Sequence, residues 1–322
     1  NSGAVWYPFA THNGLAARVE GWLNAVRARA RYGALCPAVQ NDLCTLLDEM
    51  RLIKDAHEQA IMRRASAISA GAHIRAMQRS ARMLRAGEEV REYHLDAELL
   101  HEFRQQGSQY PAYGSIVAAG ANACVLHYRA DTAPVRDGEL VLIDAGCELE
   151  GYAADITRTF PVGGCFNGAQ RDAYEIVLAA QLAAIAAIKP GASFSAYHDA
   201  AVRVLVQGMI DLKLLAGSVD GLIESEAYKP YYMHRTGHWL GLDVHDAGDY
   251  KTGDDWIKLE PGMALTVEPG LYIRPSPMVP PHLHGIGIRI EDDVVVTADG
   301  CRVYTTAPRT VAEIEAVMEH LS

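Results

Sequence analysis

The feature that most constrains this fold is a carboxylate that follows an uninterrupted apolar run. Residues 140–146 read Leu-Val-Leu-Ile-Asp-Ala-Gly, so four aliphatic side chains precede Asp144. Asp155 lies in a comparable segment, Ala-Ala-Asp-Ile-Thr. Burying an ionised carboxylate without a partner costs on the order of several kcal/mol. The fold must therefore provide a compensating charge or proton for both residues.

The positions of Asp144 and Asp155 predict that the two carboxylates meet. They are symmetric about residues 149–150, and Gly151 is a residue that favours a turn. A hairpin centred there would place them opposite each other on neighbouring strands, with Cβ atoms roughly 5 Å apart. Two adjacent anions repel, so we expect a cation or a shared proton between them.

The second half of the chain contains a matching pair. Glu268 and Glu291 each follow a strand-like segment and are symmetric about residues 279–280, within a proline-rich connection. Four carboxylates from two hairpins would form a hard-oxygen site for divalent ions. Residues 234–246 contain three histidines, one of which could be a fifth ligand, and imidazole beside carboxylates suits Mn, Co, Zn or Fe better than Mg or Ca. Such a set can hold two ions about 3.5–4 Å apart. Any one of these residues alone would be read as an ordinary surface or core residue.

The pattern of secondary structure predicts an α+β fold with an internal repeat. Helical spacing, capping residues and helix-ending glycines predict helices at residues 15–32, 56–84, 90–106, 167–188, 194–215 and 312–321. Runs rich in Val, Ile, Leu and Tyr predict strands at residues 114–128, 139–160, 231–244, 264–273 and 285–296. From residue 50 onward, two helices followed by strands occur twice, which indicates a pseudo-twofold domain. Residues 1–49 are too few to close a core alone, and we interpret them as a remnant of an N-terminal domain or a linker.

Charge and cysteine content exclude several classes of partner. The 40 acidic residues outnumber the 29 basic ones, which gives a net charge of −11 and argues against binding to nucleic acid or to an anionic membrane. The longest apolar stretch, residues 176–188, is too short to span a bilayer, and no secretory signal is visible. Six cysteines without a CxxC pair are typical of reduced thiols, so we expect a cytoplasmic protein.

Several segments together resemble those of a known family. They are residues 122–128, 143–147, 155–161, 238–246, 267–272 and 287–293. These segments resemble the pita-bread metallopeptidases, and among them the bacterial Xaa-Pro aminopeptidases (aminopeptidase P). The resemblance extends from about residue 50 to the C-terminus and implies a pita-bread catalytic domain over residues 50–322. Family members carry a longer N-terminal domain, of which residues 1–49 are what this chain could contain.

The resemblance implies a role for each candidate site residue. Two divalent ions, of which Mn is the family's suggestion and Zn or Co the alternatives, would be held by Asp144, Asp155, His238, Glu268 and Glu291. The residues placed around the substrate or beside the ligands would be His127, His234, His245 and Arg289. For Arg289 the strand pattern agrees, because residues 287, 289 and 291 share one face, from which a guanidinium can orient the ligand cluster.

The activity implied is hydrolysis of the first peptide bond of a peptide with proline in second place. The substrate's free amine would bind near the ions, which acidify a water molecule. Glu268 would accept a proton and pass it to the leaving proline nitrogen, while His245 and His127 hold the substrate carbonyl. His234 and Trp239 would help to form the proline pocket.

Four alternatives and one question about assembly stay open. A prolidase, which cleaves Xaa-Pro dipeptides, shares the implied fold, and a truncated chain could bind metal with little or no activity. A non-catalytic binding protein of this fold is disfavoured because all five ligand positions are filled. The sequence of residues 238–246 favours the proline-specific branch over methionine aminopeptidase. A homo-oligomer is compatible with the sequence.

Overall fold

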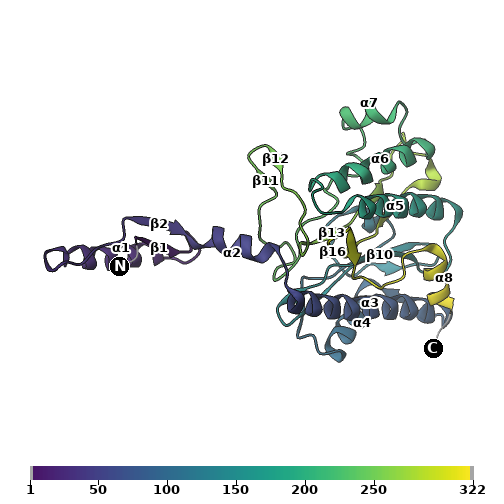
Figure 1. Ribbon diagram of the computed structural model, residues 1–322. Coiled ribbons are helices and arrows are strands. Elements are labelled where there is room, and N and C mark those ends of the chain that lie inside the picture. Colours follow the sequence, from purple (N-terminus) through teal and green to yellow (C-terminus); the bar gives the residue numbers. More distant parts are fainter. Residues whose placement is uncertain (1–2, 320–322) are drawn as a thin grey trace. The chain divides into compact units, whose positions relative to one another are not determined.

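The computed structural model describes residues 3–319 (Figure 1). The chain divides into two compact units, of which the smaller comprises residues 1–52 and 247–249, and the larger comprises residues 53–246 and 250–322. The C-terminal end of the predicted helix at residues 312–321 lies outside the described residues. Among the helices that are described, none is long and apolar enough to cross a membrane.

The smaller unit consists of two strands and two α-helices. Its elements are β1 (Ala4–Tyr7), α1 (Leu15–Arg27), the 3-10 turn η1 (Ala30–Tyr32), β2 (Val39–Asp42) and α2 (Leu43–Leu52). The strands β1 and β2 pair in parallel. The helix predicted at residues 15–32 ends at Arg27, and the last predicted residues form η1 instead.

The first half of the larger unit begins with two helices and continues with short strands. Its elements are α3 (Ala56–Arg85), β3 (Val90–Arg91), α4 (Glu92–Gln105), β4 (Tyr110–Pro111), β5 (Ile116–Ala119), the 3-10 turn η2 (Gly120–Cys124), β6 (Pro134–Val135), β7 (Leu140–Asp144), β8 (Cys147–Leu149), β9 (Tyr152–Ala153) and β10 (Thr157–Pro161). The strands form a β10-β7-β5 sheet, a β4-β8-β9 sheet and a β3-β6 pair.

The second half repeats this plan. Its elements are α5 (Gly168–Ala187), α6 (Ala196–Asp211), α7 (Val219–Glu224), β11 (Lys251–Thr252), β12 (Asp255–Trp256), β13 (Ala264–Val267), β14 (Gly270–Ile273), the 3-10 turn η3 (Pro281–Leu283), β15 (Ile286–Arg289), β16 (Asp292–Val296), β17 (Cys301–Val303) and α8 (Val311–Glu319). The strands form a β13-β16-β17 sheet, a β14-β15 pair and the β11-β12 hairpin. All pairings in the larger unit are antiparallel.

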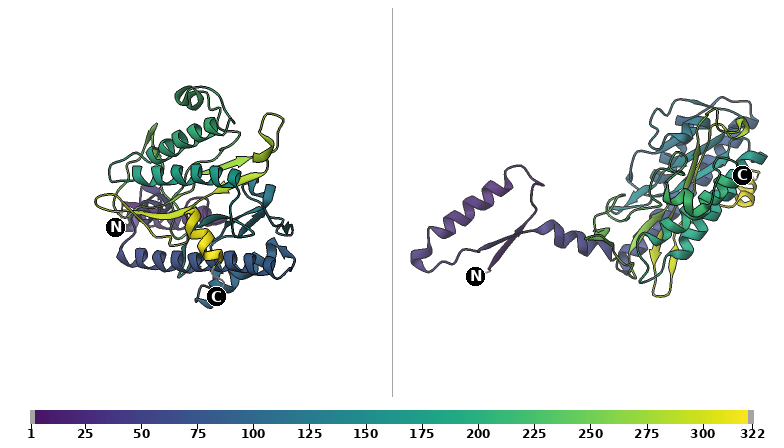
Figure 2. Two further views of the ribbon diagram at one scale, coloured as in Figure 1. Left: turned by 90° about the vertical axis from the view of Figure 1, so that its right-hand side faces the viewer. Right: turned by 90° about the horizontal axis from the view of Figure 1, so that it is seen from above.

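The strands of the larger unit lie between two helix pairs. Figure 1 shows α3 and α4 on one side and α5 and α6 on the other, and the left view of Figure 2 shows the same layers. The predicted α+β plan of helices and then strands, repeated once, is confirmed. Small side chains on α3, among them Ala65, Ala72 and Ala76, are fully buried, which lets this long helix approach the strands closely.

A capping box is present at the start of both α3 and α5. The Asp55 carboxylate accepts hydrogen bonds from the backbone N–H groups of His57 and Glu58, and Glu58 accepts one from the Asp55 N–H. Asn167 and Gln170 exchange the same two bonds at the start of α5. These bonds satisfy backbone donors that a helix N-terminus otherwise leaves unpaired, so the two long helices begin where the sequence indicates.

The register of the first hairpin differs from the prediction by two residues. Asp144 faces Thr157 across β7 and β10, and Asp155 lies in the segment that leads into β10. The turn is formed by Glu150 and Gly151, both with positive φ, of 52° and 88°. A two-residue turn with two left-handed residues matches the twist of a hairpin, which fixes this register. A shift by two keeps side chains on their original face, so both carboxylates still point to one side.

The second hairpin has the predicted register. Val267 faces Asp292 and Gly270 faces Arg289. Both pairs have the same register, and this register places Glu268 opposite Glu291. Both glutamates lie in short breaks between strands, β13 to β14 and β15 to β16. A break frees their side chains from the regular pleat and lets both point into the same cavity.

Two strand predictions are wrong. Residues 231–244 form no strand, although residues 236–240 follow the edge of β13 through three backbone bonds and one isolated bridge. The His238 N–H donates to the Thr266 hydroxyl instead of to a carbonyl, so the ladder is incomplete. The predicted strand at residues 114–128 ends at Ala119, and the turn η2 follows.

Candidate metal centre and active site

One cavity of the larger unit, with a volume of about 500 Å³, collects nine predicted site residues. They are Asp144, Asp155, His238, Glu268, Glu291, His127, His234, His245 and Arg289. Its apolar wall includes Leu126, Phe194, Tyr250 and Trp256. Side chains that are separated by more than 160 residues thus meet in a space of the size that binds small ligands.

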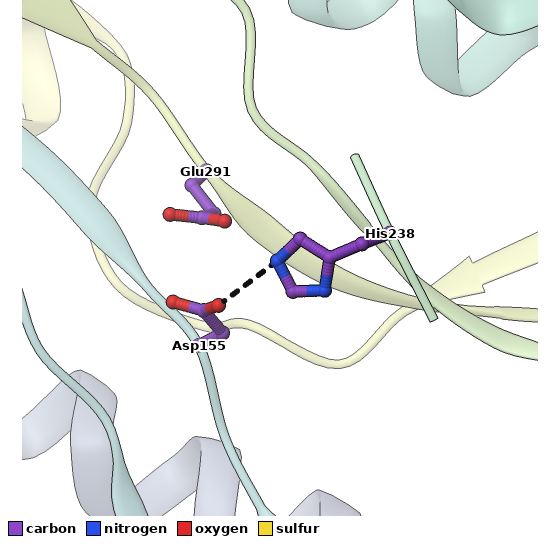
Figure 3. A group of neighbouring side chains, drawn as sticks. All are labelled: Asp155, His238 and Glu291. Atoms are coloured by element: carbon purple, nitrogen blue, oxygen red, sulfur yellow. Dashed lines mark ion pairs between the residues drawn. The ribbon is translucent and has the colours of Figure 1, made fainter. Parts of the chain in front are cut away.

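Three of the predicted ligands form the tightest group. One possible ligand atom from each of Asp155, His238 and Glu291 lies within 4.8 Å of those from the other two. Figure 3 shows the three side chains pointing toward one another from separate segments of the chain. The His238 Nε2 atom lies 3.4 Å from the Asp155 Oδ2 atom. Among the described residues this is the one group of three or more such side chains close enough to share an ion.

The ring of His238 is oriented by the backbone of the next residue. Its Nδ1 atom lies 2.9 Å from the Trp239 carbonyl oxygen, a distance at which an Nδ1–H donates. That bond leaves the lone pair of Nε2 directed at the carboxylates, which is the arrangement of a metal-binding histidine. In this structure burial opposes a charge on His238, but the bond to Asp155 and the charge of Glu268 raise its pKa to about 9.

Asp144 is joined to this group through Tyr113. The Tyr113 hydroxyl lies 2.7 Å from Asp144 Oδ1 and 2.6 Å from Asp155 Oδ1. The second oxygen of Asp144 accepts a 2.6 Å bond from the Arg289 guanidinium. Asp144 and Asp155 are therefore brought together, as predicted, by a shared partner instead of by direct pairing across strands.

Arg289 connects the ligands of both halves. Besides Asp144, it donates to the hydroxyls of Tyr272 and Thr157, each at 3.1 Å. Its Nε atom lies 4.0 Å from Glu291, and Thr157 also donates a 2.5 Å bond to Glu291. A fully buried guanidinium in this position partly neutralises the carboxylates and fixes their rotamers.

Glu268 lies between two histidines. Its Oε1 atom is 3.8 Å from His238 Nε2, and its Oε2 atom is 3.7 Å from His234 Nδ1. Burial raises the pKa of Glu268 to about 7, and the charges of Asp155 and Asp144 add to that effect. Burial and the neighbouring carboxylates thus favour the protonated form of Glu268.

The remaining carboxylates repel one another as well. Burial raises the pKa of Asp144 and raises that of Glu291 strongly, with Asp155 adding to both shifts. Burial opposes ionisation of Asp155 too, but the hydrogen bond and charge of His238 lower its pKa overall. Four carboxylates around one guanidinium leave an excess of negative charge, which divalent cations would offset. The donor set, carboxylate oxygens with one imidazole nitrogen, fits such cations.

The three histidines expected near the substrate have different surroundings. His127 and His245 are exposed, and the ring centroid of His245 lies 4.3 Å from that of His238. His234 contacts the Tyr272 hydroxyl and the Arg235 carbonyl, each at 2.8 Å, and burial lowers its pKa to about 3. His234 is therefore a neutral, fixed side chain, whereas His127 and His245 are accessible to a ligand.

Some functional neighbours are absent from the sequence-based prediction. Tyr113 bridges two ligands but lies in an irregular segment, and no motif indicates that contact. Asp293 accepts a 3.0 Å bond from the Asp155 N–H, and its burial raises its pKa well above the ordinary range. Its position directly after Glu291 and Asp292 is the feature of the sequence that could have indicated this role. Trp239 is fully buried behind Phe194, so it supports the cavity wall without lining it, contrary to expectation.

Comparison with known proteins assigns the family. The pattern of metallopeptidase family M24 matches residues 60–298. The Xaa-Pro aminopeptidase of Escherichia coli is 48% identical over 93% of this chain and 67% of its own length. That of Haemophilus influenzae is 49% identical over 85% of this chain and 62% of its own length. The chain thus spans about two thirds of the length of these relatives.

Solved structures agree with the sequence comparison. The aminopeptidase PepP of Pseudomonas aeruginosa has a TM-score of 0.93 and 52% identity, over 98% of this chain and 71% of that one. Aminopeptidase P of E. coli, solved with substrate, has a TM-score of 0.91 and 44% identity, over 98% and 71%. The predicted pita-bread fold is confirmed by this likeness. The chain belongs to metallopeptidase family M24, among the Xaa-Pro aminopeptidases.

Proposed function

We propose that this chain is a metal-dependent aminopeptidase that releases the first residue from peptides with proline in second place. The observation that carries the proposal is the convergence of all five predicted ligands, the three predicted histidines and Arg289 on one cavity. The names of the relatives support the same activity and its proline specificity. Peptides are accordingly the proposed partners.

Five side chains would hold two divalent ions. They are Asp144, Asp155, His238, Glu268 and Glu291. Manganese is the proposed metal, with zinc and cobalt as alternatives, and a zinc-substituted E. coli aminopeptidase P has been solved. Bound ions of this kind acidify water and polarise a carbonyl group.

The protein's own side chains would bind the peptide and move the proton. The carboxylates attract the substrate's free amine, which sets cleavage after the first residue. Glu268 accepts a proton and delivers it to the leaving proline nitrogen. His245 and His127, both exposed to the cavity, donate hydrogen bonds to the substrate carbonyl as its oxygen gains charge.

The proline ring would contact the apolar wall of the cavity. Phe194, Tyr250 and Trp256 present flat aromatic surfaces there. A proline ring is rigid and apolar, so it loses little entropy when it packs against such surfaces. Trp239 fixes Phe194 and Tyr250 from behind, with ring centroids at 4.6 and 5.6 Å.

The test is hydrolysis of matched tripeptides with manganese present. We expect release of alanine from Ala-Pro-Ala, at least 100-fold slower release from Ala-Ala-Ala, and loss of activity with a chelator. His245→Ala should lower kcat/KM by about 10²-fold without changing the metal content. His282→Ala is the matched control, because this exposed histidine lies outside the cavity lining, and it should retain full activity.

Other outcomes would contradict the proposal in distinguishable ways. Turnover of Ala-Pro but not of Ala-Pro-Ala would indicate a prolidase, and metal binding without turnover would indicate an inactive chain. A cytoplasmic location stays a prediction that rests on free cysteines, which the structure leaves unpaired with one another. A homo-oligomer stays a prediction as well.

A further inference from the structure

The cavity contains one cation that the proposed mechanism does not use. Arg235 lines the cavity, and its side chain is exposed. Among residues 3–319 no carboxylate lies within 4.0 Å of its guanidinium nitrogens, whereas Arg289 in the same cavity pairs with Asp144. A guanidinium has five N–H donors and binds carboxylates bidentately. Those of Arg235 are therefore available to a ligand.

The backbone of Arg235 is held in place by its neighbours. The Arg235 carbonyl is bonded to the His234 ring, which also contacts Tyr272. On the other side, the Thr236 hydroxyl lies 2.7 Å from the Tyr232 hydroxyl and 2.8 Å from His198 Nδ1. Both flanking side chains are thus fixed, and Arg235 projects from a rigid segment.

The guanidinium itself is positioned by an aromatic ring. Its Cζ atom lies 4.5 Å from the centroid of the Trp256 ring, which stacks on Phe194 at 6.0 Å with an angle of 23°. Stacking leaves the edge of a guanidinium, where the N–H groups lie, free to bind a planar anion. The Arg235 guanidinium thus lies over the Trp256 ring in the cavity wall, with N–H groups that can bind a carboxylate.

The distribution of charge in the cavity matches that of a short peptide. The acidic ligand group attracts an amine, and Arg235 lies outside that group. Because Arg235 is only three residues before the ligand His238, the backbones of these two residues are within about 11 Å of each other. The amine and carboxylate of an extended tripeptide are separated by about 10 Å. Resting on the proposed function, we infer that Arg235 binds the C-terminal carboxylate of short peptide substrates and makes the enzyme prefer them.

The test compares a free carboxylate with an amide in binding and in turnover. We expect the wild-type protein with manganese to bind Pro-Leu at least tenfold more tightly than Pro-Leu-amide in titration calorimetry. It should also cleave Ala-Pro-Ala with at least tenfold higher kcat/KM than Ala-Pro-Ala-amide. R235M should abolish both preferences by weakening only the carboxylate forms, and R235K should restore them in part.

A matched control separates recognition from stacking. Lys251 also lies over the Trp256 ring, with Nζ at 4.6 Å from the centroid, but is not among the residues that line the cavity. K251M should retain both preferences. Equal or unmeasurable binding of acid and amide by the wild type, or an R235M variant that loses both forms in parallel, would overturn the inference. Absence of turnover of any Xaa-Pro peptide, with the binding preference intact, would contradict the proposed function alone.

Discussion

A single buried arginine, Arg158, connects the two halves of the carboxylate site. Arg158 is fully buried directly behind the ligands, and its guanidinium pairs with Asp292 at 2.7 Å. It also donates to four backbone carbonyls, those of Thr157, Glu291, Ala307 and Pro308. One side chain thereby joins β10 of the first half to the segment that carries Glu291 in the second half.

Removal of this guanidinium should destabilise the protein strongly. R158M leaves the buried carbonyls and part of Asp292 unpaired, and we expect a loss of about 3–5 kcal/mol in the free energy of unfolding. R309M is the matched control, because Arg309 contacts the other Asp292 oxygen at 3.0 Å from a partly exposed position and should contribute about 1 kcal/mol or less. Urea denaturation measures both variants, and equal losses would contradict this assignment.

A buried histidine should make stability depend on pH. Burial, with a smaller contribution from the charge of Arg235, lowers the pKa of His198 from 6.5 to about 4. The unfolded chain binds the proton more readily, so the stability contributed by neutral His198 is complete above pH 6.5 and is lost as the pH falls toward 4. Its surroundings also include Asp199, Arg203 and Tyr228, which line the same small cavity.

The H198Q variant isolates this effect. Between pH 6.5 and 4, the wild type should lose about 2–3 kcal/mol more unfolding free energy than H198Q does, since each unit of pKa shift corresponds to about 1.4 kcal/mol. Urea denaturation of both proteins at several pH values provides the comparison. Parallel pH profiles would show that His198 is not the group responsible.

At the scale of elements, the site depends on two chain segments that approach each other too closely for a side chain. Gly146 follows β7, and a Cβ atom at this position would overlap the Ala154 carbonyl and come within 3.1 Å of the Asp155 backbone nitrogen. The segment that carries Asp144 therefore packs directly on the backbone of the segment that carries Asp155. A glycine is required here for space and not for its φ angle.

Substitution of this glycine should disrupt both stability and metal binding. For G146A we expect a loss of about 3 kcal/mol or more in unfolding free energy and weakened manganese binding, because the backbone must move. The control is G168A, at the first position of α5, where a Cβ atom would meet nothing within 4 Å. That variant should be neutral or more stable by up to about 1 kcal/mol. Similar melting temperatures for the two variants would refute the packing argument.

For the whole molecule, the sequence predicts most of the framework and of the ligand set. The capped helices and the β14–β15 register follow from local signals, and each carboxylate ligand is conspicuous because it interrupts an apolar segment, whereas the family resemblance identifies His238. The predictions that are wrong concern features that tertiary contacts determine. Thr266 diverts the backbone bond of His238 and prevents a strand, and two left-handed residues shift the first hairpin. Tyr113 reaches both aspartates from an irregular segment that no periodicity marks.

Five side chains that are distant in sequence are proposed to bind two divalent ions in one cavity. Equilibrium dialysis against manganese, with elemental analysis of the protein, tests this proposal most directly. We expect two ions per wild-type chain, two for the H282A control, and one or none for D155N and E291Q. A wild-type chain that retains no manganese, or variants that retain two ions, would show that these side chains do not form a two-metal site.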